Sequence, residues 1–355
     1  MTDTLSCLNL PITGDREHAS SRKQPTVKIR GRLVTTTPVF GAYWQFAAER
    51  QRIFFRRLGG SLLRLTNDPV LLGYKFTNAY RASDRVSQYL IRNVIYRDDL
   101  PKDDTNIFFR TLLFKLFNKI ETWEALEAYL GPVVWETFNY QHYDRVLSQR
   151  MRSGVAIYSA AYIMPSGGSF FGHSVKHQNH LKMLAYLVCE NYPARLTVTA
   201  RMADAFALLR SIPSVGPFLA YQYAIDLNYS TLTDFPEDDF VVAGPGALDG
   251  IHKCFIGADG ISAEDIIRYM WENQERHFAA YGVDFQSLWG RPLQLIDCQN
   301  LFCEISKYAR VAFPEYSGVA GRTRIKQKFQ PGKTTPAPWY PPKWDLNARI
   351  AQRLF

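Results

Sequence analysis

The sequence predicts a mainly α-helical protein that ends in a basic, extended C-terminal arm. Apolar residues recur every three or four positions in successive segments between residues 43 and 311. Of the 355 residues, 46% are hydrophobic and 14% are aromatic, which is enough to bury a substantial core. From residue 318 onward the chain holds eight Lys or Arg and one acid, which accounts for seven of its nine net positive charges. This balance suits a polyanionic partner.

Composition divides the chain into three parts. Residues 1–30 mix Ser, Thr, Pro and charged residues without periodicity, so we expect a disordered extension. Residues 31–317 are expected to form the helical domain, and residues 318–355 the arm, whose PAPWYPPKW stretch suggests a chain laid over a folded body. The five scattered cysteines indicate no disulfide framework, and neither a membrane helix nor a secretory signal is expected. These features favour the cytoplasm, or the nucleus in a eukaryote.

The helical elements follow one another closely. The first covers residues 43–57, where Phe46, Ala47, Ile53 and Phe54 recur at helical spacing, and Asp68-Pro69 marks the start of another. Further helices are expected over residues 83–96, 105–117, 123–130, 140–151, 179–190, 200–210, 217–227, 262–278 and 293–311. Residues 154–171 begin as an apolar, β-prone run and continue as PSGGS, so no element is assigned there.

The most specific local pattern is a helix, a tight turn and a second helix over residues 205–227. The turn reads Ile-Pro-Ser-Val-Gly from Ile212, and Gly216 can supply a backbone angle that is costly for other residues. Pro217 suits the first position of a helix, whose exposed amides and dipole form a phosphate site. We therefore expect Ser214, Val215 and Gly216 to hold a DNA backbone, with Ile212 and Val215 packed into the core. An ordinary helix corner is the alternative.

The string LLRSIPSVGPFLAYQYAIDLN resembles the hairpin of the helix-hairpin-helix DNA glycosylase superfamily. The resemblance implies a glycosylase-like helical fold, with a catalytic Asp about twenty residues beyond the hairpin Gly. Asp234, Asp238 and Asp239 fall in that window, and the adjacent pair Asp238 and Asp239 precedes the apolar run VVAGPGA. Either could stabilise an oxocarbenium-like sugar or activate a nucleophile, unless the loop is merely a solvated acidic one. Pro-Phe-Leu follows the Gly where bifunctional members carry a Schiff-base Lys, so no lyase step is expected.

Three other strings narrow the resemblance: FTNAYRASDRVSQYLIRNVIY from Phe76, DDFVVAGPGALDGIHKCF from Asp238 and LQLIDCQNLFCEISKYARV from Leu293. Together they resemble the helical domain attached to 5-hydroxymethyl-deoxyuridine DNA kinases, and the related α-glutamyl/putrescinyl thymine pyrophosphorylases, over about Val39 to Gln330. The resemblance implies action on hypermodified thymine in DNA. No Gly-x-x-x-x-Gly-Lys-Ser/Thr loop is present, so we expect the helical part without the kinase half, and a separate DNA-base kinase as a partner.

Polar residues in the first and third strings are spaced to line a substrate pocket. In the first string they lie three or four residues apart, as on one face of a helix, and Tyr80 or Tyr89 could stack on a flipped base. A surface Arg–Asp network is the alternative. In the third string a polar stripe is expected to border the same pocket. The pocket residues predicted from the two strings are Asn78, Arg81, Asp84, Gln88, Asp297 and Asn300.

Two weaker patterns complete the set of candidate sites. Arg322, Arg324 and Lys326 alternate with other residues, so an extended arm would place their charges on one side to follow a phosphate backbone, unless it is a solvated tail. The histidines of HSVKHQNH, from His173 to His180, are spaced like metal ligands. No carboxylate or Cys completes that set locally, and we expect neither a metal nor another cofactor.

These features predict an enzyme that binds DNA containing modified pyrimidines and flips the modified base into a helical pocket. A pyrophosphorylase would displace pyrophosphate from an activated 5-hydroxymethyl group and attach an amine, and the family resemblance favours this chemistry. A glycosylase that excises a bulky modified base, in defence against phages, is the first alternative. A non-enzymatic helix-hairpin-helix module that only binds DNA is the second.

Overall fold

The computed structural model describes residues 25–60, 65–161, 164–330 and 336–354. The chain forms two compact units, which we describe separately. Unit 1 contains the residues up to Ser83, Ala243–Ala337 and the last three residues, and unit 2 contains Asp84–Val242 and Pro338–Gln352. The expected extension over residues 1–30 lies largely outside the described residues, and its last part, from Thr26, is already a strand.

A small antiparallel sheet lies at one end of unit 1, in the order β1 (Thr26–Ile29), β2 (Arg32–Thr36), β3 (Phe255–Ile256). Arg30 and Gly31 join the first two strands, and both have positive φ, 48° and 82°, as a two-residue hairpin turn requires. No strand was expected from the sequence here. The strands are too short to display a clear alternation of apolar and polar residues.

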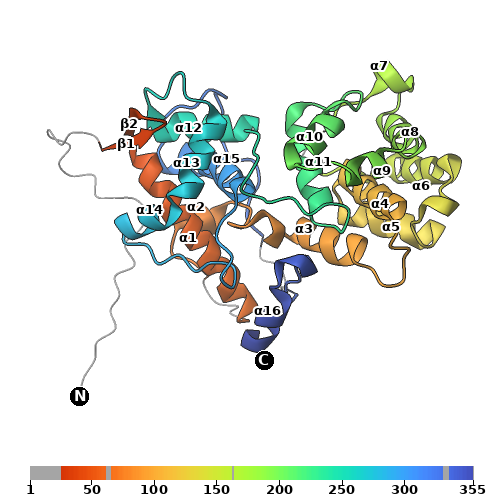
Figure 1. Cartoon of the computed structure of the whole chain (residues 1–355), viewed down its shortest axis with the longest axis horizontal. Coiled ribbons are helices and arrows are strands. Elements are labelled where there is room, and N and C mark those ends of the chain that lie inside the picture. Colours follow the sequence, from red (N-terminus) through yellow and green to blue (C-terminus); the bar gives the residue numbers. More distant parts are fainter. Residues whose placement is uncertain (1–24, 61–64, 162–163, 331–335, 355) are drawn as a thin grey trace. The chain divides into compact units, whose positions relative to one another are not determined.

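Figure 1 shows the helices of unit 1 gathered beside the sheet. Their buried side chains include many aromatic ones. These helices are α1 (Pro38–Leu58), α2 (Pro69–Gly73), the 3-10 turn η1 (Arg81–Ser83), α12 (Pro245–Cys254), α13 (Ala263–Glu272), α14 (Gln274–Ala280) and α15 (Leu295–Ala312). α12 and α15 approach closely because Gly250 faces the backbone of Phe302. A Cβ at Gly250 would lie 2.1 Å from the Phe302 carbonyl oxygen, so only glycine fits there.

Unit 2 is built around the buried helix α4 (Asp104–Phe117), which contacts α5, α8, α9 and α11. Its helices are α3 (Arg85–Tyr89), α4, α5 (Ile120–Leu130), α6 (Tyr140–Arg152), α7 (Gly168–Phe171), α8 (Lys176–Cys189), α9 (Tyr192–Thr197), α10 (Met202–Arg210), α11 (Pro217–Asn228) and α16 (Asn347–Leu354), with short turns η3 (Trp135–Thr137) and η4 (Pro342–Trp344). The prediction of a mainly helical protein is confirmed.

The helix expected over residues 83–96 is present from Arg85 to Ile95, but it changes from an α-helix to a π-helix after Tyr89. Residues Leu90–Ile95 form a π-helix, η2, in which the Tyr96 N–H donates to the Ile91 carbonyl at 3.0 Å. The segment 154–171, to which the sequence assigned no element, contains only the short helix α7 among its described residues. None of the helices in the described parts of the chain combines the length and apolar character needed to cross a bilayer.

Candidate functional site

The predicted hairpin is present in unit 2 as α10, a tight turn and α11. Ile212 and Val215 are 2% and 1% exposed, which confirms that they anchor the turn in the core. The Arg210 guanidinium closes the turn by donating to the Val215 carbonyl oxygen at 2.7 Å. The start of α11 is thereby held in place by the turn.

The role expected for the Gly216 backbone angle is wrong. Gly216 has φ −80° and ψ 169°, an extended conformation open to any residue. The positive φ, 68°, is at Ser214. No heavy atom of the described residues lies within 4 Å of the position that a Cβ on Gly216 would occupy. The glycine therefore leaves open space beside the helix start and relieves no strain.

The segment after α11 is folded back onto the end of that helix by Asn228. Its side-chain oxygen accepts from the Thr233 hydroxyl at 3.0 Å and from the Phe235 N–H at 2.9 Å. Its amide nitrogen donates to the Phe235 carbonyl at 3.0 Å, and Asn228 itself is buried. These contacts fix the beginning of the acidic segment relative to the hairpin.

Phe240 fixes the other end of the same segment. Its ring lies 5.2 Å from the ring of Phe206 on α10 and 5.9 Å from that of Tyr221 on α11. The Tyr221 hydroxyl also donates to the Phe240 carbonyl at 3.3 Å. Because the hairpin helices hold Phe240, the two carboxylates that precede it belong to the same packed structure as the hairpin.

The two candidate catalytic carboxylates have different environments. Asp238 is half-buried and Asp239 is exposed, while the preceding Glu237 is buried. All three lie between the points fixed by Asn228 and Phe240. Sequence reasoning missed both of these positioning residues, since an isolated Asn or Phe carries no spacing signal.

In unit 1, two of the expected pocket residues shape the loop that follows α2. Asp297 is 3% exposed and accepts from the Arg81 N–H at 2.8 Å and from the Gln294 N–H at 3.0 Å. The Asn78 side chain donates to the Ser83 carbonyl at 2.7 Å and accepts from Arg50 at 3.2 Å. Asp297 is thus a helix cap that also holds the chain at Arg81.

Arg50 is a further organising residue of this loop. It is 5% exposed, and its guanidinium donates to the Thr77 carbonyl at 2.8 Å and to the Phe76 carbonyl at 3.2 Å. A charged residue on a helix face that is otherwise apolar was the available signal, because a buried guanidinium needs hydrogen-bond acceptors. Asn300 lies half-buried one turn beyond Asp297 on α15.

The expected single polar face between residues 78 and 88 is wrong. Arg81 lies in η1, and Asp84 is the extended cap of α3, with φ −69° and ψ 144°, so no continuous helix joins them. Asn78, Arg81, Asp297 and Asn300 belong to unit 1, whereas Asp84 and Gln88 belong to unit 2. In unit 2 the Gln88 side chain accepts from the Trp339 N–H at 2.8 Å.

The arm is not extended throughout as expected, because its last part forms the helix α16 (Asn347–Leu354). Its first part is fastened to unit 1 without forming a strand, apart from an isolated bridge between Tyr74 and Lys328. Its backbone is held at Ala320 by Asp249 (2.8 Å), at Arg324 by Arg310 (3.2 Å), at Gln327 by Lys75 (3.1 Å) and at Phe329 by Gly73 (3.2 Å). Ile325 is buried, whereas Arg322, Arg324 and Lys326 are exposed. The arm therefore presents their charges to solvent from a fixed backbone.

Asp249 is the buried anchor at the start of this arm. It accepts from the Ser306 hydroxyl and lies 3.5 Å from Lys253. Burial raises the pKa of Asp249, but the hydrogen bonds from Ser306 and Ala320 and the charge of Lys253 outweigh it and lower that pKa below its usual value. A Cβ at Gly318 would lie 2.1 Å from the Asp249 carboxylate, so the arm must pass this point as glycine.

Two histidines of unit 2, His177 and His180, are buried in the core of that unit. His177 Nε2 lies 2.7 Å from Asp144, and His180 bonds the Tyr158 hydroxyl and the Pro165 carbonyl, each at 2.8 Å. The Nε2 of His177 and the two ring nitrogens of His180 therefore contact three different partners. Within the described residues, no group of three or more His, Cys, Asp or Glu side chains could hold a metal ion.

Comparison with known proteins gives one family. The model described as "5-hmdU DNA kinase, helical domain" matches residues 37–318. The chain is also 26% identical over 298 residues to a 5-hmdU DNA kinase of Bacillus phage SP10, an alignment that covers 79% of this chain and 46% of the relative. The chain thus spans less than half the length of that curated relative. No solved structure matches.

Proposed function

The chain belongs to the family of 5-hmdU DNA kinase helical domains, and from that premise we propose that it acts on DNA carrying a 5-hydroxymethyl-derived pyrimidine. One observation carries the proposal. The hairpin and the acidic segment with Asp238 and Asp239 are fastened together within unit 2, through Asn228 and Phe240. The proposed phosphate site at the start of α11 and the carboxylates of Asp238 and Asp239 are thereby held within the same unit.

The division of labour follows from the chemistry of each part. The amides at the start of α11 hold the backbone without reading sequence, as Gly216 leaves room for a phosphate to approach. The exposed Arg322, Arg324 and Lys326 add sequence-independent attraction. An enzyme can reach the reactive atoms of a base only after the nucleotide leaves the base stack, so the carboxylates act on a flipped nucleotide.

Amine transfer is the reaction we favour. Because one relative is a 5-hmdU DNA kinase, the substrate we infer is a 5-hydroxymethyl group activated as its diphosphate ester, from which diphosphate is a good leaving group. In the transfer, a carbon–nitrogen bond forms at the 5-methylene carbon while its carbon–oxygen bond to the diphosphate breaks. The neutral amine attacks the methylene carbon, the ammonium formed by that attack gives up a proton to the carboxylate of Asp238 or Asp239, and the diphosphate departs as an anion.

Base excision is the second candidate, carried by the position of the acidic pair just beyond the hairpin. Here the carboxylate stabilises positive charge on the deoxyribose as the N-glycosidic bond breaks. Water then adds to the sugar carbon, and the modified base is released with a proton.

The test incubates the full chain with DNAs that contain normal, 5-hydroxymethylated, pyrophosphorylated or glucosylated pyrimidines, with and without putrescine or glutamate. Mass spectrometry follows released bases and altered nucleosides. An amine-bearing thymine in an intact strand supports transfer, and a free base with an abasic site supports excision. Salt-sensitive DNA binding without any product would reduce the chain to a binding module and contradict both enzymatic reactions.

A further inference from the structure

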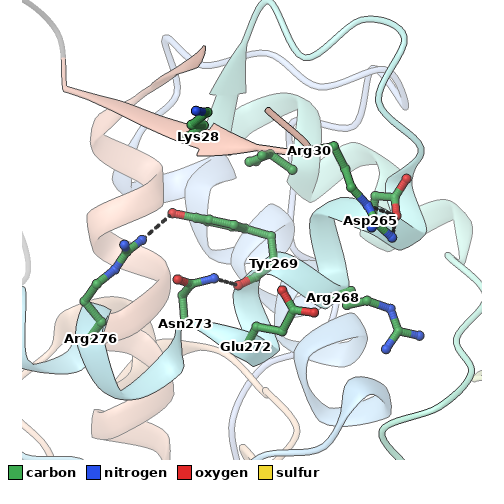
Figure 2. Close-up of a pocket in the computed structure, with 9 residues that line it drawn as sticks. Lys28, Arg30, Asp265, Arg268, Tyr269, Glu272, Asn273 and Arg276 are labelled. Atoms are coloured by element: carbon green, nitrogen blue, oxygen red, sulfur yellow. Dashed lines mark hydrogen bonds and ion pairs between the residues drawn. The ribbon is translucent and has the colours of Figure 1, made fainter. Parts of the chain in front are cut away.

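A polar cavity of about 210 Å³ lies in unit 1 between strand β1 and the corner at which α13 meets α14. It is separate from the hairpin of unit 2 and from the contacts that fasten the arm. Figure 2 shows its side chains arriving from β1 and the following turn on one side and from the two helices on the other. The charged side chains that line it are Lys28, Arg30, Arg268, Arg276, Asp265 and Glu272.

One basic residue of the cavity is neutralised by a neighbour. The Arg30 guanidinium contacts Asp265 at 2.6 and 2.8 Å, and Asp265 also accepts from the Ser262 hydroxyl at 2.8 Å. The hydrogen bonds from Ser262 and Arg30 lower the pKa of Asp265, which therefore stays ionised. The charges of Arg30 and Asp265 consequently cancel, and the pair forms one wall of the cavity.

Two other cations are not compensated in this way. Within the described residues, neither Lys28 nor Arg276 has a carboxylate at ion-pair distance. Arg276 instead donates to the hydroxyl of Tyr269 at 2.9 Å, and Figure 2 shows its guanidinium directed at that oxygen below β1. The guanidinium is fixed by a neutral partner and keeps its full charge.

The Tyr269 hydroxyl is itself oriented from the core. It lies 2.9 Å from Nε2 of His277, which is 6% exposed and stacked on Trp44. Burial, together with the charge of Arg276, lowers the pKa of His277 to about 4. At neutral pH the ring is therefore uncharged and adds no second positive charge beside Arg276.

We propose that this cavity binds a phosphate group, which Arg276 and Lys28 hold against the side of β1. A planar guanidinium with free N–H donors suits phosphate oxygens, and an ammonium adds a mobile point charge. Glu272, which also lines the cavity, limits its net charge, so the cavity suits a single phosphate group at a time. The phosphate can come from a DNA backbone or from a free phosphate compound, and the binding chemistry is the same.

The test compares the wild type with Lys28→Gln/Arg276→Gln and a charge-matched control, Arg145→Gln/Arg152→Gln, on exposed positions of α6. Calorimetric titration uses inorganic phosphate and pyrophosphate, and fluorescence anisotropy uses an unmodified duplex across salt concentrations. If the phosphate belongs to a free compound, inorganic phosphate or pyrophosphate should bind the wild type saturably, and its affinity should fall about ten- to hundredfold in the cavity variant alone. If the phosphate belongs to a DNA backbone, the magnitude of the slope of log K against log salt should decrease by about 1 in the cavity variant and stay unchanged in the control.

Tyr269→Phe separates the positioning of Arg276 from its charge. It retains the ring and all charges but removes the oxygen that fixes the guanidinium, so binding should weaken by a smaller factor than in the double variant. Equal phosphate and DNA binding by the wild type, the cavity variant and the control, all of them folded by circular dichroism, would overturn the proposal. Phosphate titration needs no modified base, so this inference and the proposed function can fail independently.

Discussion

At the scale of single residues, the two adjacent carboxylates in the segment held by Asn228 and Phe240 carry the strongest expectation. Asp238→Asn and Asp239→Asn each remove one negative charge and keep the side-chain shape. We expect at least one of them to lower turnover by about 10²-fold or more while DNA affinity stays within about twofold of the wild type. Single-turnover product formation and anisotropy measure the two quantities.

The control for this pair is Asp98→Asn, a highly exposed acid of unit 2 that only pairs with Lys102 on the surface. It changes the net charge equally and should leave turnover unaffected. Full turnover in both Asp238→Asn and Asp239→Asn would remove these carboxylates from the reaction.

His180 predicts a dependence of stability on pH. Burial lowers its pKa to about 4 from an ordinary value of 6.5, and its two ring nitrogens bond the Tyr158 hydroxyl and the Pro165 carbonyl. The unfolded chain therefore takes up a proton below about pH 6.5 that the folded chain refuses until about pH 4. The contribution is complete above pH 6.5 and is lost as pH falls, by about 3 kcal/mol at most.

Urea unfolding between pH 7 and pH 4.5 measures this dependence. His180→Gln cannot titrate in that range, so its free energy of unfolding should fall less steeply over the interval than that of the wild type. Parallel pH profiles for the two proteins would show that His180 does not contribute.

At the scale of the elements, two different residues of the hairpin carry the backbone strain and the open space for a ligand. Ser214 has φ 68°, so Ser214→Gly should raise the free energy of unfolding by about 0.5–1 kcal/mol. Gly216→Ala meets no neighbouring atom and should change stability by less than about 1 kcal/mol, yet weaken DNA binding about tenfold if a phosphate approaches there. Chemical denaturation and anisotropy, run on the same preparations, compare the two variants, and unchanged DNA binding by Gly216→Ala would contradict the hairpin contact.

The elements also show what the sequence could predict. Strong helical periodicity located α1, α4 and α15 and the hairpin helices, because their apolar faces are long enough to reveal the repeat. The short strands and the π-helix Leu90–Ile95 depend on tertiary packing, which leaves no local pattern. The prediction of one polar helix face from Arg81 to Gln88 is wrong for a related reason: the spacing fits a helix, but the backbone is extended at Asp84.

At the scale of the whole molecule, we expect the arm to make DNA binding sensitive to salt. Replacing Arg322, Arg324 and Lys326 together with Gln should reduce the slope of log K against log salt by about 2–3 if each contacts a phosphate. Arg145, Arg152 and Arg195, also exposed, provide a control with the same change in charge. Equal slopes for the two triple variants would show that the arm does not bind phosphates.

The same arm can be displaced without altering its charge. Gly318→Ala places a methyl group against the Asp249 carboxylate, so the backbone of the arm can no longer keep its position beside that carboxylate. We expect faster proteolysis between residues 318 and 330 with the helical core intact, and trypsin digestion followed by mass spectrometry measures it. Wild-type cleavage rates in Gly318→Ala would mean that another contact fastens the arm.

The discontinuity of unit 1 also sets an order of events during synthesis. Strands β1 and β2 and helix α1 leave the ribosome first, but α12, α13 and α15, against which they pack, follow only after the long segment Asp84–Val242. That segment can assemble around α4 before the helices that cover the apolar face of α1 have been synthesised. The nascent chain therefore exposes aromatic side chains such as Tyr43 and Trp44 for the time needed to translate it, and chaperones would be needed most in that interval.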